Sequence, residues 1–213
     1  MKNKSVVLFL MLTLSMAPII SQSLAAQPTG QASVLLPDGR TLVVGGEDAA
    51  GKPSKRLMAV LPDQANTTTQ IADLHVPRAW AAAVVLADGT ILITGGITTG
   101  GDLVEAAELL DMKNQSTTII KGIKLKPRAR HTSTMLNDGS VLLAGGINEK
   151  SLATDSVDII NTRNWTVETI PEALAAARYD HLTFPFLDKP IVITGGRDET
   201  DKPIVADELF SPG

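Results

Sequence analysis

The sequence predicts an all-β protein in which one four-stranded sheet is repeated about four times, and three recurring features carry this prediction. Double glycines stand fifty residues apart, at Gly45-Gly46, Gly95-Gly96, Gly145-Gly146 and Gly195-Gly196. Asp-Gly pairs recur in register at Asp38-Gly39, Asp88-Gly89 and Asp138-Gly139, and the fourth copy has Asp188-Lys189. Arginine recurs with the same spacing at Arg78, Arg128 and Arg178. Three independent columns in register indicate four copies of one fifty-residue unit.

Each copy contains short runs of β-forming residues separated by turn residues, which is the pattern of a four-stranded sheet. The first two runs flank Asp-Gly, a dipeptide that tolerates the positive φ of a tight hairpin turn. The second run is apolar at consecutive positions, as at Leu92 and Ile93, so its strand must be covered on both faces. The double glycine after it allows close approach of a neighbouring backbone. Sheets stacked as the blades of a β-propeller meet these requirements. Only residues 171–178, with an alanine run, could form a helical turn.

The third copy carries the most specific motif. It reads Arg128-x-x-His131, then Asp138-Gly139 and Gly145-Gly146, then the strand 157–161 with Asp158, and finally Trp165. This order of a basic opening, a double glycine, an acidic residue and a tryptophan resembles a kelch repeat. The other copies depart from the pattern: the second has Leu110 where the family favours tyrosine, and the first has Met58 at the acidic position.

The resemblance covers about residues 31–213 and implies a kelch-type β-propeller. It is similar to the central propeller of galactose oxidase, but lacks the oxidase site, which depends on a cysteine cross-linked to tyrosine; the chain has no cysteine and only Tyr179. Kelch proteins have many functions, so the resemblance does not assign an activity.

The expected organisation is a signal peptide over residues 1–26, followed by blades at 27–77, 78–127, 128–177 and 178–213. The fourth copy ends just after its third strand, so that blade is incomplete. Propellers usually have four to eight blades. We therefore expect an open or partial ring, from the N-terminal part of a longer gene or a truncated product. Open blade edges of this kind favour self-association.

The N-terminus has the features of a secretory signal peptide. Lys2 and Lys4 precede an apolar run from residue 6 to about 20, and Ser23-Leu24-Ala25 predicts cleavage after Ala25 or Ala26. An uncleaved anchor is the alternative, and no other segment is apolar enough to span a membrane. The chain has no cysteine, which fits a bacterial periplasmic or secreted protein without disulfides.

Composition excludes several kinds of partner and site. Without cysteine there is no disulfide, thiolate metal site, cysteine nucleophile or lipid-modified cysteine. Removal of the leader, with its two lysines, leaves 17 basic and 23 acidic residues, a net charge of 17 − 23 = −6. That charge argues against nucleic acid or an anionic membrane as partner. We expect no metal and no cofactor, since the histidines lack ligand spacing and residues 197–201 lack the spacing of a calcium loop.

The recurring polar residues are expected to be structural. Arg78, Arg128, Arg178, His131 and His181 recur with the repeat, so we assign them, with the double glycines, to packing and hydrogen bonding between blades. The acidic column Glu108, Asp158 and Glu208 is expected to pair with the arginines. His75 is isolated and indicates nothing.

Residues outside the recurring columns are better candidates for binding, because the repeat does not require them. They lie on or beside the loops Glu47–Arg56, Ile97–Leu103, Ile147–Thr154 and Arg197–Ile204, which leave one face of the propeller and are called the loop face below. The alternative for each is an ordinary solvated loop residue. The candidates are Trp80, Arg130, Tyr179, Asp180, Arg197 and Asp198.

No catalytic constellation is present, so the sequence favours an exported interaction module that binds a protein or glycan over an enzyme. The alternative is a fragment of a periplasmic carbohydrate-active kelch enzyme such as a sialic acid mutarotase, whose chemistry needs only acid–base residues in a central pocket. Aromatic residues make up only 3% of the chain, which leaves few platforms for stacking on sugars.

Overall fold

The structure is a computed structural model that describes residues 29–61, 67–186 and 189–211. The regular structure in these residues is β-strand, and no helix is formed, so none of them crosses a membrane as a helix. The first two sheets contain β1 (Gln31–Leu35), β2 (Thr41–Gly45), β3 (Arg56–Val60), β4 (Thr68–Asp73), β5 (Ala82–Val85), β6 (Ile91–Thr94), β7 (Glu108–Asp111) and β8 (Ser116–Ile119). The next two contain β9 (Thr132–Met135), β10 (Val141–Ala144), β11 (Val157–Asn161), β12 (Thr166–Ile170), β13 (Tyr179–Phe186), β14 (Lys189–Arg197) and β15 (Glu208–Phe210).

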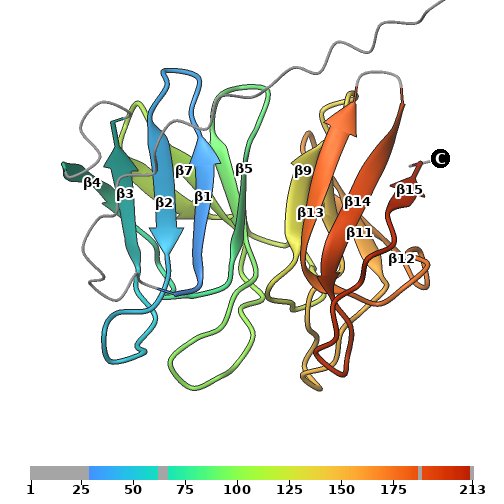
Figure 1. Cartoon of the computed structure of the whole chain (residues 1–213). Helices are drawn as coiled ribbons and strands as arrows, with labels where there is room; N and C mark the ends of the chain where they lie inside the picture. The colour runs from blue at the N-terminus through green and yellow to red at the C-terminus, as the bar shows by residue number, and fades with distance from the viewer. Residues whose placement is uncertain (1–28, 62–66, 187–188, 212–213) are drawn as a thin grey trace, which may run out of the picture.

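Each sheet is an antiparallel meander whose strands pair in sequence order. Three sheets have four strands, and the fourth has three within the described residues, β13, β14 and β15. We number them blades 1 to 4 in chain order. The long loops after the double glycines gather at the lower end of the molecule in Figure 1, and the Asp-Gly hairpins lie at the upper end. The predicted all-β propeller with four blades is confirmed.

The Asp-Gly hairpin closes the first two strands of a blade in the way the dipeptide predicts. Gly39 has φ +85°, and the amide of Leu36 donates to the carbonyl of Arg40 at 2.8 Å. The Asp38 carboxylate accepts the amide of Arg40 at 3.0 Å, which fixes the turn from within. This geometry sets the register in which Ser33 stands opposite Val43.

The blades stack through their faces, and each interface is an apolar core. The inner strands β1, β5, β9 and β13 pack against one another in that order. In β6, Ile91 and Ile93 join the core shared with blade 1, while Leu92 joins the core shared with blade 3. All three side chains are fully buried, and each such burial contributes about 1.5–3 kcal/mol. The consecutive apolar residues of the second strand are therefore explained by cores on both faces.

The double glycines are required by contact with the next blade. The amide of Gly96 donates to the carbonyl of Arg128 at 2.9 Å, and a Cβ on Gly95, at φ +61°, would overlap that same carbonyl oxygen. Blades 1 and 3 repeat the arrangement with Gly45-Gly46 and Gly145-Gly146. Only glycine combines the positive φ with the missing side chain.

Residues 171–178 form turns, and the helical turn considered for them is absent. The amides of Ala173 and Leu174 both donate to the carbonyl of Asp155, at 3.1 and 2.9 Å. Leu174 is buried in the core between blades 3 and 4. Tertiary hydrogen bonds and burial thus override the helix propensity of the alanines.

Candidate functional site

Four residues, one from each blade, form a ladder at the inner edge of the propeller on the loop face. Gly30, Trp80, Arg130 and Asp180 precede or begin the inner strands, and each has a left-handed φ between +53° and +68°. Their backbones are joined blade to blade: Trp80 donates to Gly30 at 2.6 Å, Arg130 to Trp80 at 2.9 Å, and Asp180 to Arg130 at 3.0 Å. We call these four residues the inner ladder.

The inner ladder corrects one part of the sequence interpretation. Trp80, Arg130 and Asp180 were expected to fall outside the recurring columns, but they stand fifty residues apart and share one column with Gly30. The position is constant in conformation and varies only in residue type. A left-handed φ is costly for residues other than glycine, so the shared conformation is imposed by the inter-blade hydrogen bonds.

The side chains of the inner ladder also contact one another from blade to blade. The guanidinium of Arg130 lies 3.8 Å from the ring centroid of Trp80 and donates to the Asp180 carboxylate at 2.8 Å. The indole nitrogen of Trp80 donates to Glu47 at 3.4 Å, and the ring packs on Gly30, where a Cβ would overlap it. The Trp80 ring therefore packs against Gly30 and the Arg130 guanidinium, and it is not an open aromatic platform.

A second group of polar side chains stands beside the ladder in blade 4. The Tyr179 hydroxyl donates to Asp201 at 2.6 Å, and this hydrogen bond raises the pKa of the phenol. Arg197 donates to the carbonyl of Asp201 at 2.8 Å and lies 3.3 Å from its carboxylate. The guanidinium of Arg130 is also 5.7 Å from the Tyr179 ring. Five of the six candidate residues thus lie in one connected region.

The sixth candidate, Asp198, belongs to the framework of a loop. Its carboxylate accepts the amides of Thr200 and Lys202, at 2.8 and 3.0 Å. Asp48 and Asn148, in the same column, make the equivalent turn in blades 1 and 3. The hydrogen bonds of Asp198 are therefore those of a turn residue.

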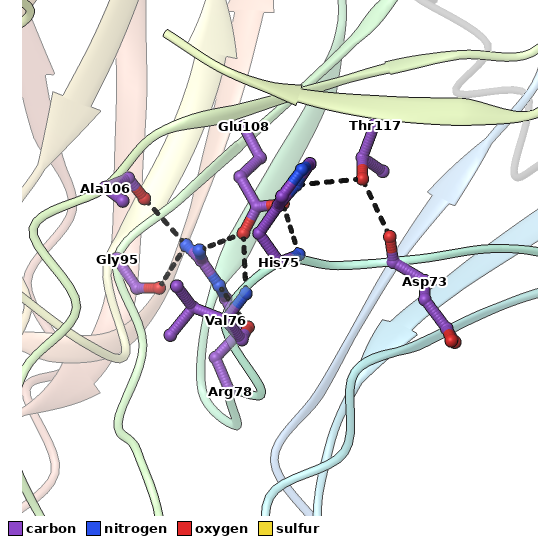
Figure 2. A network of polar contacts seen from close by, with 8 residues as sticks. All are labelled: Asp73, His75, Val76, Arg78, Gly95, Ala106, Glu108 and Thr117. Atoms are coloured by element: carbon purple, nitrogen blue, oxygen red, sulfur yellow. Dashed lines mark hydrogen bonds and ion pairs between the residues drawn. The ribbon is translucent and has the colours of Figure 1, made fainter. Parts of the chain in front are cut away.

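The recurring arginines are buried. Figure 2 shows the polar contacts that Arg78 makes. Arg78 donates to the carbonyls of Gly95 and Ala106, at 3.1 and 2.9 Å, and to the Glu108 carboxylate at 2.5 Å. Desolvation is the main influence on this guanidinium and lowers its pKa despite the nearby Glu108. Arg128 pairs with Asp158 at 2.9 Å and Arg178 with Glu208 at 3.2 Å, so the expected arginine–acid pairing is present in blades 2 to 4.

The two recurring histidines lie buried at the interfaces between blades. The Nε2 atom of His131 is 2.9 Å from the Thr94 hydroxyl, and that of His181 is 3.1 Å from the Thr132 hydroxyl. Burial is the largest influence on both rings; it lowers the pKa of His181 to about 4 and that of His131 well below its usual value. Both rings are therefore neutral near pH 7. They are buried between blades, directly after Arg130 and Asp180 of the inner ladder.

Three residues that the sequence analysis did not select take part in these networks. Glu47 binds Trp80 and accepts the Thr29 hydroxyl at 2.7 Å, and Asp201 joins Tyr179 to Arg197. Glu47 and Arg197 are the two charged residues in a column otherwise occupied by isoleucine, a signal that column-by-column comparison could have used. His75 is bound through its backbone and ring to Glu108, at 2.7 and 3.0 Å (Figure 2).

Two hollows lie away from the inner ladder. A groove of about 380 Å³ separates the loops of blades 2 and 3 and is lined by Asp102, Glu105 and Glu149 among others. A cavity of about 410 Å³ lies near the Asp-Gly hairpin of blade 3, against Met135, Asp138 and Phe186. The described residues hold no group of three or more histidine or acidic side chains arranged for a metal ion.

Comparison with known proteins shows the fold alone. No family profile matches the chain, and no curated protein matches it. A solved structure described as "Structure of YjhT" is similar, with a TM-score of 0.65 and 13% sequence identity over 88% of this chain and 68% of that chain. Together with the stacked four-stranded sheets, this similarity identifies the chain as a β-propeller.

Proposed function

We propose that this protein is an exported, kelch-type propeller that acts as a binding module and takes its ligand at the inner ladder. The observation that carries the proposal is the set of non-glycine residues, Trp80, Arg130 and Asp180, held at positive φ in successive blades. Such strained positions concentrate where a fold holds side chains for function. Their types differ from blade to blade, as recognition of an asymmetric ligand would require.

The chemistry of the region favours a hydroxyl-rich glycan as ligand. Arg130, Asp180 and Tyr179 are partly or fully exposed and supply donors and acceptors within one area. The anchors of protein interfaces are instead large side chains that fill apolar pockets. Here the aromatic ring of Trp80 is already covered by Arg130.

A glycan array followed by tryptophan fluorescence tests this proposal. The Trp165→Phe variant leaves Trp80 as the only tryptophan, so displacement of Arg130 by a bound sugar should change its emission. Each glycan that binds on the array would be titrated against this variant. We expect saturable changes that are lost in Arg130→Ala and in Asp180→Asn.

Arg163→Ala is the matched control, since Arg163 is exposed at the hairpin between β11 and β12, at the end opposite the loop face. It should leave glycan binding unchanged. No binding on the array, or equal binding by Arg130→Ala, would contradict the proposed glycan function and would favour a protein ligand or none.

A further inference from the structure

Within the part of the chain that the structure describes, blades 1 and 4 each have one face that does not pack against a neighbouring blade, and we call these two surfaces the end faces. They correspond to the two halves of an interface that the molecule forms three times internally. Each internal interface joins the face of one blade that includes Leu42, Leu92 or Leu142 to the face of the next that includes Ile93, Leu143 or Ile193. These six side chains are fully buried. The corresponding residues at the two ends of the stack are Val192 in blade 4 and Val43 in blade 1, and both are only partly buried.

The end face of blade 4 is apolar, and none of the described residues covers it. Leu182, Phe184 and Leu209 are 60%, 47% and 69% exposed. The register places Phe184 and Leu209 directly opposite Val192 on its two sides, so these side chains share one face with Leu182. Large apolar side chains gathered on one surface mark a site of association.

The end face of blade 1 presents the complementary half. Leu35 is 69% exposed and alternates with Val34, which packs into the core shared with blade 2. The register places Val43 opposite both Ser33 and Met58, so Met58 lies on the same face. Within the described residues, β13 does not pack back on β1, and neither end face is covered by the other.

Among the residues described, the backbone of blade 4 also lacks a contact that the other three blades make at their double glycines. At Gly45, Gly95 and Gly145 the space beside the glycine is filled by an arginine carbonyl of the next blade. At Gly195 a Cβ would meet nothing within 4 Å, although its φ of +66° is close to those of the other three glycines. Thr194, which corresponds to the Thr94 that binds His131, binds Asp207 of its own blade at 2.5 Å.

The two faces also carry opposite charges at the loop-face end. Arg56 begins β3, is exposed, and alternates with Leu57 of the core, so it lies on the end face of blade 1. Asp207 is exposed directly before β15 on blade 4. Opposite charges placed in this way favour one orientation of docking.

We propose that a second copy of this chain docks head to tail, with the end face of its blade 1 covering the end face of blade 4. The contact extends the blade-to-blade interface that the chain already forms, and every copy carries both halves. Repeated contacts of this type close into a ring or continue as an open chain of copies. The contact involves neither the inner ladder nor its ligand, so it stands apart from the proposed function.

Sedimentation velocity over a range of concentrations tests this docking with the full-length protein produced by export. We expect the wild type to form dimers or larger species. Leu35→Asp and Leu209→Asp should each weaken association by about tenfold or more, because each buries an unpaired charge. Both residues are exposed in the single chain, so the circular dichroism spectrum should not change. Leu152→Asp is the matched control: Leu152 is a 44% exposed leucine on the loop face of blade 3, and this variant should associate like the wild type.

A mixture of the two variants distinguishes head-to-tail docking from other modes. Leu35→Asp retains an intact blade 4 face and Leu209→Asp retains an intact blade 1 face, so the mixture should form a heterodimer that neither variant forms alone. A wild type that stays monomeric at every concentration would overturn the proposal. So would a Leu35→Asp variant that associates as strongly as the wild type, since that result indicates blade 4 pairing with blade 4. A mixture that associates no more strongly than either variant alone would also overturn it.

Discussion

Arg130 and Asp180 lie fifty residues apart in the sequence and form an ion pair 2.8 Å long between adjacent blades. The ring of Trp80, fifty residues before Arg130, lies 3.8 Å from the same guanidinium. One column of the repeat therefore supplies an aromatic ring, a cation and an anion in consecutive blades. The stacking of blades converts spacing in the sequence into contact in space.

We expect Arg130→Ala to affect binding more than stability. Arg130 and Asp180 are partly exposed, and such pairs contribute about 0.2–1 kcal/mol, with about 0.5–1 kcal/mol more from the cation–π contact. A double-mutant cycle with Asp180→Ala, measured by urea unfolding, should give a coupling energy in the first range. A coupling above about 2 kcal/mol would show that the pair is a structural element of the fold.

Asp158→Asn should destabilise the protein strongly. Asp158 is fully buried, accepts from Arg128 at 2.9 Å and from Thr169 at 2.6 Å, and its loss of charge leaves the buried guanidinium uncompensated. Breaking one side of a buried ion pair costs about 3–5 kcal/mol. Urea unfolding measures the loss. Asp102→Asn, at an exposed loop position, is the control and should change the free energy of unfolding by less than about 0.5 kcal/mol.

The repeat made most of the fold predictable, because turn and packing requirements recur in the same columns. Stacked sheets explain each of these recurring features in one way. The Asp-Gly pairs form the hairpin turns, the consecutive apolar residues of the second strands pack into cores on both faces, and the double glycines allow contact with the next blade. Local propensity failed at residues 171–178, where alanines suggest a helical turn. The carbonyl of Asp155 accepts hydrogen bonds from the amides of Ala173 and Leu174 there. No local sequence pattern predicts such a tertiary hydrogen bond.

The candidate site was predictable in its members but not in its geometry. Trp80, Arg130 and Asp180 attract attention as unusual residue types, yet their identity as one column becomes meaningful only when the backbone is seen at positive φ. Asp198 appeared equally unusual, and the structure gives it the turn also made by Asp48 and Asn148. Residue type alone cannot separate a side chain that faces a ligand from one that closes a loop.

The buried histidines should make the protein less stable as the pH falls below about 6.5. An unfolded histidine has a pKa near 6.5, whereas burial and the nearby Arg178 lower the pKa of His181 to about 4. Between these values the unfolded chain binds a proton that the native protein does not. The contribution of His181 to the free energy of unfolding is therefore fully present above pH 6.5. It is lost as the pH falls toward 4, and amounts to on the order of 3 kcal/mol.

Urea unfolding between pH 7.5 and 5 measures this dependence above the range in which most carboxylates titrate. His181→Gln should be less stable at pH 7.5 but should show a shallower loss on acidification. Arg163→Ala is the control, because Arg163 is exposed at the hairpin between β11 and β12 and does not titrate in this range, and it should keep the slope of the wild type. An unchanged slope in His181→Gln would show that the ring titrates at its ordinary pKa.

Gly95→Ala and Gly195→Ala form a matched pair that separates backbone strain from contact between blades. Both glycines have nearly the same left-handed φ, +61° and +66°, so an alanine at either position costs about 1–2 kcal/mol of strain. Only at Gly95 would the new methyl group overlap the Arg128 carbonyl and the His131 ring, so blades 2 and 3 would have to separate. We expect Gly95→Ala to cost at least about 2 kcal/mol more than Gly195→Ala in urea unfolding at low protein concentration. Equal losses would show that the double glycine is needed for its conformation alone, and that close approach of the next blade does not constrain it.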